Sequence, residues 1–406
     1  MVDYSRYYST LALSMKPSAV RALAAIMRKL KDVITFTGGY PDPATFPKEE
    51  IGEIAKEVIT KYGTVALQYG ETKGVFDARE AICSFVNKTK GIKCDPNSEI
   101  ILTTGSQESL YLVGKIFANP GDYVITENPT YISAIGAFKV SGVRFIGIPF
   151  DEYGMKTDLL EQKLSSLPKE ELSKVKYIYT IPVAQNPGGV SMSLERKKHL
   201  LEIASKYDLI IFEDDPYSYI VFEKDVDITP LKAMDKEGRI VYTSTISKIL
   251  SPGLRVGWIV GDQDVISKAE LVKSFVNLHT SNVDQLITAE AIKQGIVERN
   301  LAKALPLYKA KKEAMLNAIK ENFPEYVWHS NPIGGLFVFL YVNKPGFDAD
   351  ALLPKSVEQY RVAYIPGSGF HVDNSGKNSM RLNFSYPTFE QIKEGIARLG
   401  KLIKEA

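Results

Sequence analysis

Between residues 99 and 261 the chain alternates short apolar runs with longer segments whose apolar positions recur at helical spacing. Several of the short runs lack polar alternation, which is typical of parallel strands buried on both faces. The predicted strands are Glu99–Thr104, Asp122–Thr126, Arg144–Phe150, Lys176–Pro182, Asp208–Glu213, Arg239–Ser244 and Arg255–Gly261. The helices predicted between them, long enough for crossover connections, are Gln107–Phe117, Ile132–Val140, Thr157–Leu167 and Leu194–Lys206. The pattern predicts an α/β domain with a mostly parallel sheet, whose last two strands, joined without a long helix, can pair antiparallel.

The pattern changes on either side of this domain. Residues 264–320 are mainly helical and include a long connecting helix, and a compact α+β unit follows Pro332. The first 47 residues hold one amphipathic helix near Ala19–Leu30 and a Gly/Pro-rich stretch, Thr37–Pro47, that is too short to fold alone. We therefore expect an N-terminal arm (1–47) docked on the small domain, a large domain (48–290) and a small α+β C-terminal domain (291–406).

Composition narrows the class of protein. The 406 residues allow two or three domains, and 45% hydrophobic with 24% charged residues is the composition of a globular chain with a large core. The net charge of +2 is too balanced to attract nucleic acid or an anionic membrane over the whole surface. No stretch approaches the roughly 20 apolar residues of a membrane helix, and no signal-peptide pattern begins the chain. We expect a cytoplasmic enzyme.

Cysteine, histidine and metal chemistry is not indicated. Cys83 and Cys94 lack a histidine at zinc-ligand spacing, and we expect two reduced, buried thiols, with a disulfide as the alternative. The four histidines are scattered, and HExxH and GxSxG are absent from the sequence. We predict no metal site.

In a parallel sheet, ligands bind beyond the carboxyl ends of the strands, so the loops that follow the strands are the places to examine. After the first strand, Gly105 permits a tight turn and Ser106 can cap a helix whose free amides suit a phosphate; an ordinary helix cap is the alternative. GxGxxG and P-loop motifs are absent, so a dinucleotide or nucleotide triphosphate is not supported.

Four further loops contain candidate groups. They offer an aromatic ring (Tyr131), a turn amide (Asn186), the acidic run Glu213-Asp214-Asp215, and an amine among hydroxyls and aliphatic residues (Lys248). Three adjacent carboxylates repel one another unless a cation lies near, although solvated loop acids explain them as well. A lysine after a buried strand can be partly desolvated and become a nucleophile able to form a Schiff base. Together the five loops offer a phosphate cup, a ring, an amide, an acid and an amine at one edge of the sheet.

This combination resembles the class I/II aminotransferases, which are fold type I enzymes dependent on pyridoxal phosphate. The matching strings, which span nearly the whole chain, are Gly105-Ser106-Gln107, Asn128-Pro129-Thr130-Tyr131, Gln185-Asn186-Pro187, Asp214-Asp215-Pro216-Tyr217, Ser247-Lys248, Arg255-Val256-Gly257-Trp258 and Arg381-Leu382-Asn383-Phe384-Ser385. Within the group the chain is most similar to 2-aminoadipate, kynurenine and aromatic amino-acid aminotransferases, from the strings 36–42 and 67–70. The resemblance implies a three-layer fold with a mostly parallel central sheet and a smaller α+β domain.

The resemblance also implies a role for each matching residue. Lys248 matches the lysine that holds the cofactor covalently and moves the proton, and Asp214 matches the acid that pairs with the ring nitrogen. Asp214 is preferred to Asp215 because Tyr217 follows it by three. The other implied cofactor contacts are Asn186 and Tyr217 at the phenolic oxygen, Tyr131 stacked on the ring, and Ser106, Gln107, Thr245, Ser247 and Arg255 at the phosphate, with Tyr69 reaching the phosphate from a partner subunit.

For the substrate, the resemblance implies that Arg381 holds the α-carboxylate with Gly39 and Asn186 nearby, and that Arg21 is a candidate for a distal carboxylate. The sequence departs from the usual family string at Gly188, where a threonine is common, which leaves the asparagine intact.

The implied activity is transfer of the amino group of an L-amino acid to a 2-oxo acid, most readily 2-oxoglutarate, by a ping-pong mechanism in a homodimer with shared sites. Alternatives within the fold are an alanine–glyoxylate aminotransferase, a pyridoxal-phosphate-dependent β-lyase and a ligand-sensing regulator. The last needs a DNA-binding module, and the chain enters the enzyme-like pattern within its first 40 residues.

Overall fold

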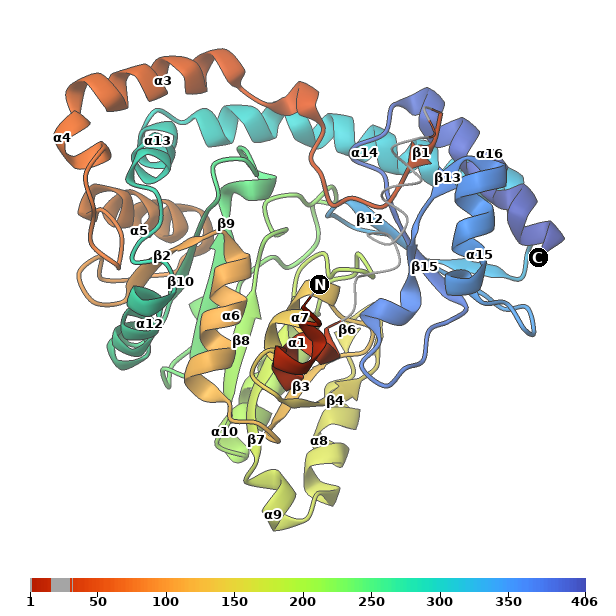
Figure 1. Ribbon diagram of the computed structural model, residues 1–406, viewed down its shortest axis with the longest axis horizontal. Helices are drawn as coiled ribbons and strands as arrows, with labels where there is room; N and C mark the ends of the chain where they lie inside the picture. Colours follow the sequence, from red (N-terminus) through yellow and green to blue (C-terminus); the bar gives the residue numbers. More distant parts are fainter. Residues whose placement is uncertain (1, 16–29, 31) are drawn as a thin grey trace.

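A computed structural model describes residues 2–15, 30 and 32–406. Its centre is a seven-stranded sheet in the order β2-β10-β9-β8-β7-β3-β4 (Figure 1). The strands are β2 (Ile100–Thr104), β3 (Tyr123–Glu127), β4 (Arg144–Ile148), β7 (Val175–Thr180), β8 (Ile210–Asp214), β9 (Ile240–Thr245) and β10 (Val256–Val260). β10 runs antiparallel to both of its neighbours, whereas the other neighbouring pairs are parallel. The mostly parallel sheet and its antiparallel last strand are as the sequence predicts.

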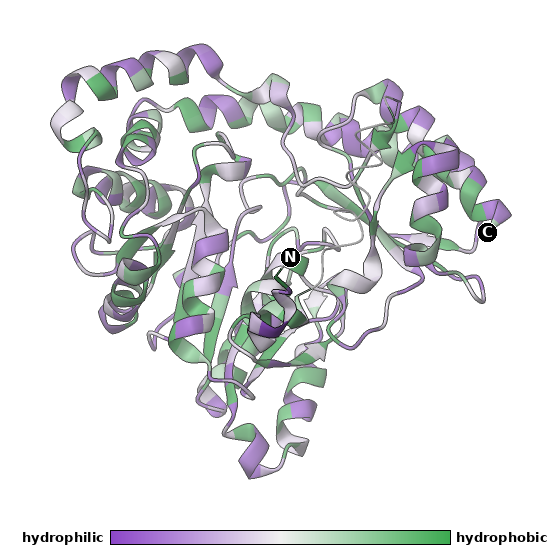
Figure 2. Ribbon diagram, viewed as in Figure 1, coloured by the Kyte–Doolittle hydropathy of each residue, from purple (hydrophilic) through white to green (hydrophobic). Residues whose placement is uncertain are grey.

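Helices cover both faces of this sheet, which gives three layers. In β7, Tyr177 and Tyr179 belong to the core on one face and Ile178 to the core on the other, so the strand is buried on both sides. The first face is packed by α5 (Phe76–Lys90), α6 (Ser106–Phe117), α7 (Ile132–Lys139) and α13 (Asn282–Lys293), and the second by α8 (Thr157–Ser166) and α10 (Leu194–Lys206). Hydrophobic and hydrophilic residues alternate along the outer helices, as amphipathic covers require (Figure 2).

A second, four-stranded antiparallel sheet has the order β11-β12-β15-β14. It consists of β11 (Val327–His329), β12 (Phe337–Val342), β15 (Ser379–Asn383) and β14 (Ile365–Pro366), accompanied by α15 (Ala349–Lys355) and α16 (Phe389–Glu405). The 27-residue helix α14 (Ile296–Asn322) runs from the flank of the large sheet to this second sheet (Figure 1). β1 (Ile34–Thr35) pairs in parallel with β13 (Val362–Ala363) in a separate two-stranded sheet and so ties the N-terminal arm to the C-terminal part of the chain. The domain boundaries at residues 47 and 290 stay predictions.

The remaining helices lie mostly outside the predicted pattern. α3 (Lys48–Lys61), α4 (Gly63–Ala66) and α5 occupy residues 48–90, for which the sequence analysis assigned no element; α12 (Gln263–Val276) precedes α13 as expected. The described residues also include the short helices α1 (Thr10–Ser14), α9 (Lys169–Leu172) and α11 (Leu231–Met234) and the two-stranded pair β5 (Phe150–Asp151) and β6 (Gly154–Met155). The helix predicted near Ala19–Leu30 falls outside the described residues except for Leu30.

The cysteine prediction is wrong, because Cys83 and Cys94 form a disulfide. α5 ends at Lys90, and Gly91, in the left-handed region at φ 68°, turns the chain back beside the helix. The Cα atoms of the two cysteines are thereby 5.8 Å apart, within the range that a disulfide spans.

None of the helices in the described ranges combines the length and apolarity needed to cross a membrane. Among the same residues, no group of three or more His, Cys, Asp or Glu side chains is arranged to hold a metal ion.

Candidate active site

A cavity of about 660 Å³ lies between the carboxyl ends of the large sheet's strands and the small sheet. Five strand-end segments open into it, those that follow β2, β3, β7, β8 and β9. The opposite wall comes from the N-terminal arm and from β12, β14 and β15. Its lining includes Gly39, Ser106, Gln107, Tyr131, Asn186, Asp214, Tyr217, Thr245, Ser247, Lys248, Arg255 and Arg381. The structure thus brings together the groups that the sequence places on separate loops.

Lys248 ends a short 3-10 helix (Ile246–Lys248) directly after β9. The neighbouring Ile246 and Ile249 are fully buried, which anchors the backbone and directs the amine into the cavity. Its Nζ donates a hydrogen bond of 2.8 Å to the carbonyl oxygen of Gly39. Burial, together with the positive charges of Arg381 and Arg255, lowers the pKa of Lys248 to about 8. About a tenth of the amine is therefore in the neutral, nucleophilic form at pH 7, far more than for a solvent-exposed lysine.

The three carboxylates that end β8 have separate environments. Glu213 accepts hydrogen bonds of 2.8 Å from the backbone nitrogens of Leu231 and Lys232 at the start of α11. Asp215 accepts hydrogen bonds from the backbone nitrogen and hydroxyl of Ser218 and from the hydroxyl of Tyr242. It does not belong to the described residues that line the cavity. Neutral donors, rather than a cation in the site, therefore satisfy these two acids.

Asp214 differs from both, because only one of its oxygens is satisfied. Oδ2 accepts a hydrogen bond of 2.8 Å from the hydroxyl of Tyr179. Oδ1 is buried and has no hydrogen-bond partner within the described chain. Burial raises the pKa of Asp214 to about 7. The unpaired oxygen can accept a hydrogen bond from a ligand in the cavity.

A cradle for an anion forms where β2 meets α6. A side chain at Gly105 would place its Cβ 2.4 Å from Nη2 of Arg255, and one at Gly257 would place its Cβ 2.8 Å from the backbone nitrogen of Ser106. The backbone amides at the start of α6 and the Arg255 guanidinium therefore approach one spot only because both positions are glycine. Hydroxyls of Thr245 and Ser247, 2.8 Å apart, lie on the same wall of the cavity.

The expected helix cap at Ser106 is wrong in detail. Gly105, at φ 68°, takes the N-cap position, and Ser106 is the first residue of α6. No side chain caps the first turn of this helix, so the amides and the Ser106 hydroxyl stay available for an anion.

Arg381 extends from β15 in the small sheet to the far wall of the cavity. Its Nη1 donates to Oδ1 of Asn186 at 3.1 Å and its Nη2 to the carbonyl oxygen of Thr37 at 2.9 Å. The guanidinium lies 3.9 Å from the ring centroid of Phe337. Burial lowers its pKa to about 10, and the group stays cationic at neutral pH. A planar cation held in this way is suited to a carboxylate.

Two tyrosines complete the wall around Asp214. Tyr131 precedes α7 and Tyr217 follows β8, and burial raises the pKa of both hydroxyls, so both stay protonated donors. Tyr217 packs edge-on against Phe337, with ring centroids 6.0 Å apart.

The sequence analysis missed Phe337, Thr37 and Tyr179, which hold the charged groups in place. A core-like aromatic residue in a strand and a backbone carbonyl carry no chemical signal in the sequence.

One expected site residue, Tyr69, does not line this cavity. Tyr69 is 79% exposed and lies edge-on to His279, with ring centroids 6.0 Å apart. Arg21 lies outside the described residues.

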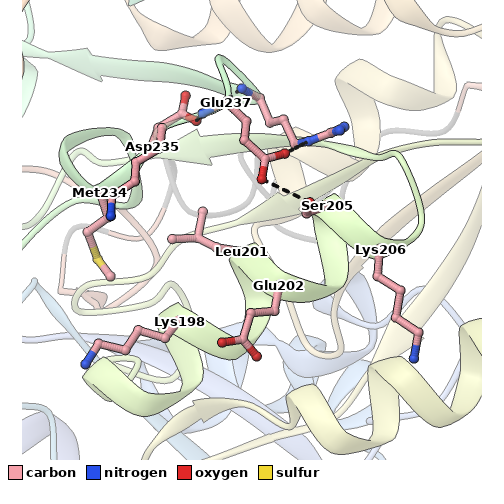
Figure 3. A pocket seen from close by; sticks show the side chains of 10 residues that line it. Lys198, Leu201, Glu202, Ser205, Lys206, Met234, Asp235 and Glu237 are labelled. Carbon is pink, nitrogen blue, oxygen red and sulfur yellow. Dashed lines mark hydrogen bonds and ion pairs between the residues drawn. The ribbon is translucent and has the colours of Figure 1, made fainter.

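A larger cavity, of about 770 Å³, lies at the opposite, amino ends of β8 and β9 (Figure 3). There the side chains of α10 face the 234–239 loop, and Glu237 is already engaged within the chain: the Ser205 hydroxyl donates to it at 3.0 Å, and Arg239 pairs with it at 2.6 Å. Ligands of parallel sheets bind at the carboxyl ends, so the 660 Å³ cavity is the candidate active site.

A three-layer α/β fold with a buried lysine, an acid and an anion cradle at the carboxyl edge of its sheet defines a fold type I, pyridoxal-phosphate-dependent transferase. The family can be stated as well. This chain belongs to the class I and II aminotransferases, whose family model matches residues 32–399.

Relatives of known name agree with this assignment. Aromatic-amino-acid aminotransferase 1 of Thermococcus litoralis is 44% identical over 100% of this chain and 95% of its own length. The kynurenine aminotransferase of Pyrococcus horikoshii, solved in complex with PMP, superposes with a TM-score of 0.94 at 42% identity, covering 99% of this chain and 98% of that one. An archaeal alanine:glyoxylate aminotransferase superposes with a TM-score of 0.94 at 40% identity over 100% of both chains.

Proposed function

We propose that this enzyme transfers the amino group of an L-amino acid with an aromatic, kynurenine-like or 2-aminoadipate side chain to a 2-oxo acid, with 2-oxoglutarate as the acceptor, in a ping-pong cycle. Relatives whose names include aromatic-amino-acid aminotransferase and 2-aminoadipate transaminase support the donor class. The observation that carries the proposal is one cavity that holds a desolvated amine, a half-satisfied acid and a buried guanidinium.

The residues of the cavity fit pyridoxal phosphate. The unpaired Oδ1 of Asp214 provides the acceptor that a protonated ring nitrogen requires. The cradle at Gly105 and Gly257, with Ser106, Gln107, Ser247, Thr245 and Arg255, provides amides, hydroxyls and a cation for the phosphate. Tyr131, Asn186 and Tyr217 line the same cavity, where Tyr131 would contact the ring face and Asn186 and Tyr217 would hydrogen-bond its phenolic oxygen. When bound, the cofactor accepts the amino group and withdraws electrons from the substrate's α-carbon.

Lys248 acts as the anchor of the cofactor and as the carrier of the proton. Its lowered pKa, caused by burial, leaves Nζ able to take a proton from the substrate's α-carbon near neutral pH. Nζ of Lys248 contacts the carbonyl oxygen of Gly39, and Arg381 contacts that of Thr37 in the same segment. The amine therefore reaches toward the side of the cavity on which Arg381 lies.

Arg381 and Gly39 hold the substrate's α-carboxylate. Arg381 is oriented by Thr37, Asn186 and Phe337, so its planar fork is presented without further ordering. A side chain at Gly39 would place its Cβ 3.2 Å from Phe337 and 4.0 Å from Nζ of Lys248, so glycine keeps this approach open. Arg21 stays a candidate for a distal carboxylate.

The working unit is a homodimer in which Tyr69 serves the partner's phosphate site. Tyr69 is exposed, and so are the apolar side chains of Leu67, near it in the sequence, and of Leu271, Phe275 and Leu278 in and directly after α12. Phe275 is 87% exposed, and large apolar side chains left in solvent in this way support a protein contact here.

Replacement of the lysine tests the proposal. Lys248→Ala should retain the fold but lose amino transfer and the covalent attachment of the cofactor, because no other amine lines the cavity among the described residues. Borohydride reduction of the wild type followed by peptide mapping should find the label at Lys248. A variant that still transaminates, or a label elsewhere, would refute the assignment.

Similarity to an archaeal alanine:glyoxylate aminotransferase supports a second candidate, with alanine as donor and glyoxylate as acceptor. A panel of amino donors assayed with 2-oxoglutarate and with glyoxylate separates the two. Release of ammonia or pyruvate without a new amino acid would instead indicate a β-lyase.

A further inference from the structure

Tyr179 is a core residue whose hydroxyl contacts the candidate cofactor acid. It lies in β7, is fully buried, and its ring packs against Phe138 and Phe212 at centroid distances of 5.2 and 5.8 Å. Its hydroxyl donates a 2.8 Å hydrogen bond to Oδ2 of Asp214 on the neighbouring strand. Aromatic packing on the ring fixes the direction of this donor, although the side chain does not line the cavity.

The two oxygens of Asp214 are therefore not equivalent. Oδ2 is engaged by Tyr179, whereas Oδ1 is buried without a partner in the described part of the chain. A carboxylate with one oxygen fixed cannot rotate freely, so the other oxygen keeps its direction.

The surroundings of Asp214 disfavour its negative charge. Burial and the nearby carboxylates of Asp215 and Glu127 raise its pKa, while the hydrogen bond from Tyr179 lowers it. Burial and the neighbouring Asp214 charge raise the pKa of Tyr179 itself far above the usual range, so its hydroxyl remains a donor at every working pH. Tyr179 is thus a permanent donor that opposes the neutralisation of Asp214.

We propose that Tyr179 is a positioning residue that holds Asp214 ionised and aims Oδ1 at the cofactor's ring nitrogen. This inference rests on the proposed function, in which that nitrogen pairs with Asp214. In a shared-proton pair, the donor from Tyr179 stabilises the state in which the proton resides on nitrogen and the charge on the carboxylate.

The chain provides a matched control at Tyr177. It lies two residues earlier on the same face of β7, packs against Phe138 and Phe212 at 5.4 and 6.5 Å, and its buried hydroxyl has no partner among the described residues. Tyr177→Phe and Tyr179→Phe each remove one buried oxygen and keep the ring, but only the second removes a hydrogen bond to Asp214. Both variants should fold.

The test follows the ring nitrogen directly. Wild type, Y177F and Y179F are reconstituted with cofactor labelled with nitrogen-15 in the ring, and the nitrogen chemical shift is compared at neutral pH. We expect the nitrogen shift of Y177F to match that of the wild type, and the shift of Y179F to move toward the unprotonated value. The ratio of protonated to unprotonated ring nitrogen should fall by about tenfold, which is the effect of losing one hydrogen bond to a charged group. In Y179F, kcat should fall by a similar factor while KM for the amino donor changes little.

An unchanged nitrogen shift in Y179F overturns the role of Tyr179 and leaves the proposed function intact. A wild-type nitrogen that is already unprotonated overturns the pairing with Asp214, and with it the proposed function, before any variant is compared.

Discussion

The unpaired oxygen of Asp214 makes the free energy of folding less favourable, and a ligand that donates a hydrogen bond to it would offset this loss. Glu213 and Asp215 reach donors within the chain, whereas Asp214 keeps Oδ1 buried without one among the described residues. A group that is kept unsatisfied for a ligand destabilises the protein without that ligand.

Replacement of Asp214 by asparagine should therefore stabilise the cofactor-free protein in a pH-dependent way. The folded-state pKa is raised from 3.8 to about 7, so between these values the folded chain binds a proton that the unfolded chain does not. The free energy of unfolding of the wild type then falls as pH rises through this window. D214N removes this dependence, and its advantage should be absent near pH 4 and reach on the order of a few kcal/mol by pH 8.

Chemical denaturation of both cofactor-free proteins at several pH values measures this difference. The variant should also lose most of its amino-transfer activity. A D214N protein that is no more stable than the wild type at pH 8 would contradict the account.

At the residue scale, the sequence reveals those groups that follow a strand and carry chemistry. Lys248, Asp214 and Asn186 were found in this way, and all line the cavity. Tyr179 and Phe337 could not be found, because a tyrosine or phenylalanine inside a buried strand is indistinguishable from core packing until its neighbours are known.

At the element scale, the close contact between β10 and the start of α6 decides the shape of the anion cradle. In the first turn of α6, Glu108 forms a buried ion pair with Lys273 of α12, in which Nζ lies 2.9 Å from Oε2. Oε2 in turn accepts from the backbone nitrogen of Thr104, so α6, α12 and β2 are fixed together. The cradle is therefore a rigid joint rather than a flexible loop.

Gly257→Ala should damage this joint. Its Cβ would lie 2.8 Å from the backbone nitrogen of Ser106, closer than such atoms approach, so the first turn of α6 must shift. We expect the affinity for pyridoxal phosphate to fall by about tenfold or more, because aligned amides at a helix start hold the phosphate.

Gly261→Ala provides the control, since it follows the same strand and its Cβ would meet only ordinary contacts, at 3.7 Å from Val265. Equilibrium titration of the cofactor into both variants gives the comparison. Equal affinities would show that the close contact is not needed.

Elements were predicted where the hydrophobic period was regular. All seven strands of the large sheet and four of its helices were located, because buried parallel strands and amphipathic crossovers leave clear patterns. The N-cap position of Gly105 depends on its close approach to Arg255, and the turn that brings Cys94 to Cys83 depends on packing beside α5. A local sequence pattern contains neither contact.

At the scale of the whole molecule, two sheets of one chain build the cavity, and Tyr69 is exposed and does not line it. A site that needs a residue from another copy can be tested by mixing subunits, since two defects in different chains can be separated in a hybrid.

Hybrids of Lys248→Ala and Tyr69→Ala chains should regain activity at limiting cofactor. If Tyr69 serves the partner, each hybrid contains one complete site, and random mixing should restore about a quarter of the wild-type sites. A mixture of Lys248→Ala and Asp214→Asn chains is the control and should restore none, because both residues line the same cavity of one chain. If the first mixture recovers no activity, Tyr69 does not serve the partner's site.

The position of β2 at the edge of the sheet also has a consequence for biosynthesis. Its strand neighbour in the sheet is β10, which follows it by some 150 residues. As the polypeptide leaves the ribosome, the apolar segment Ile100–Leu102 must wait for Val256–Val260 to emerge before it can pair. The anion cradle is therefore among the last features of the large sheet to assemble, and a nascent chain stalled before residue 256 contains Lys248 but no completed cradle.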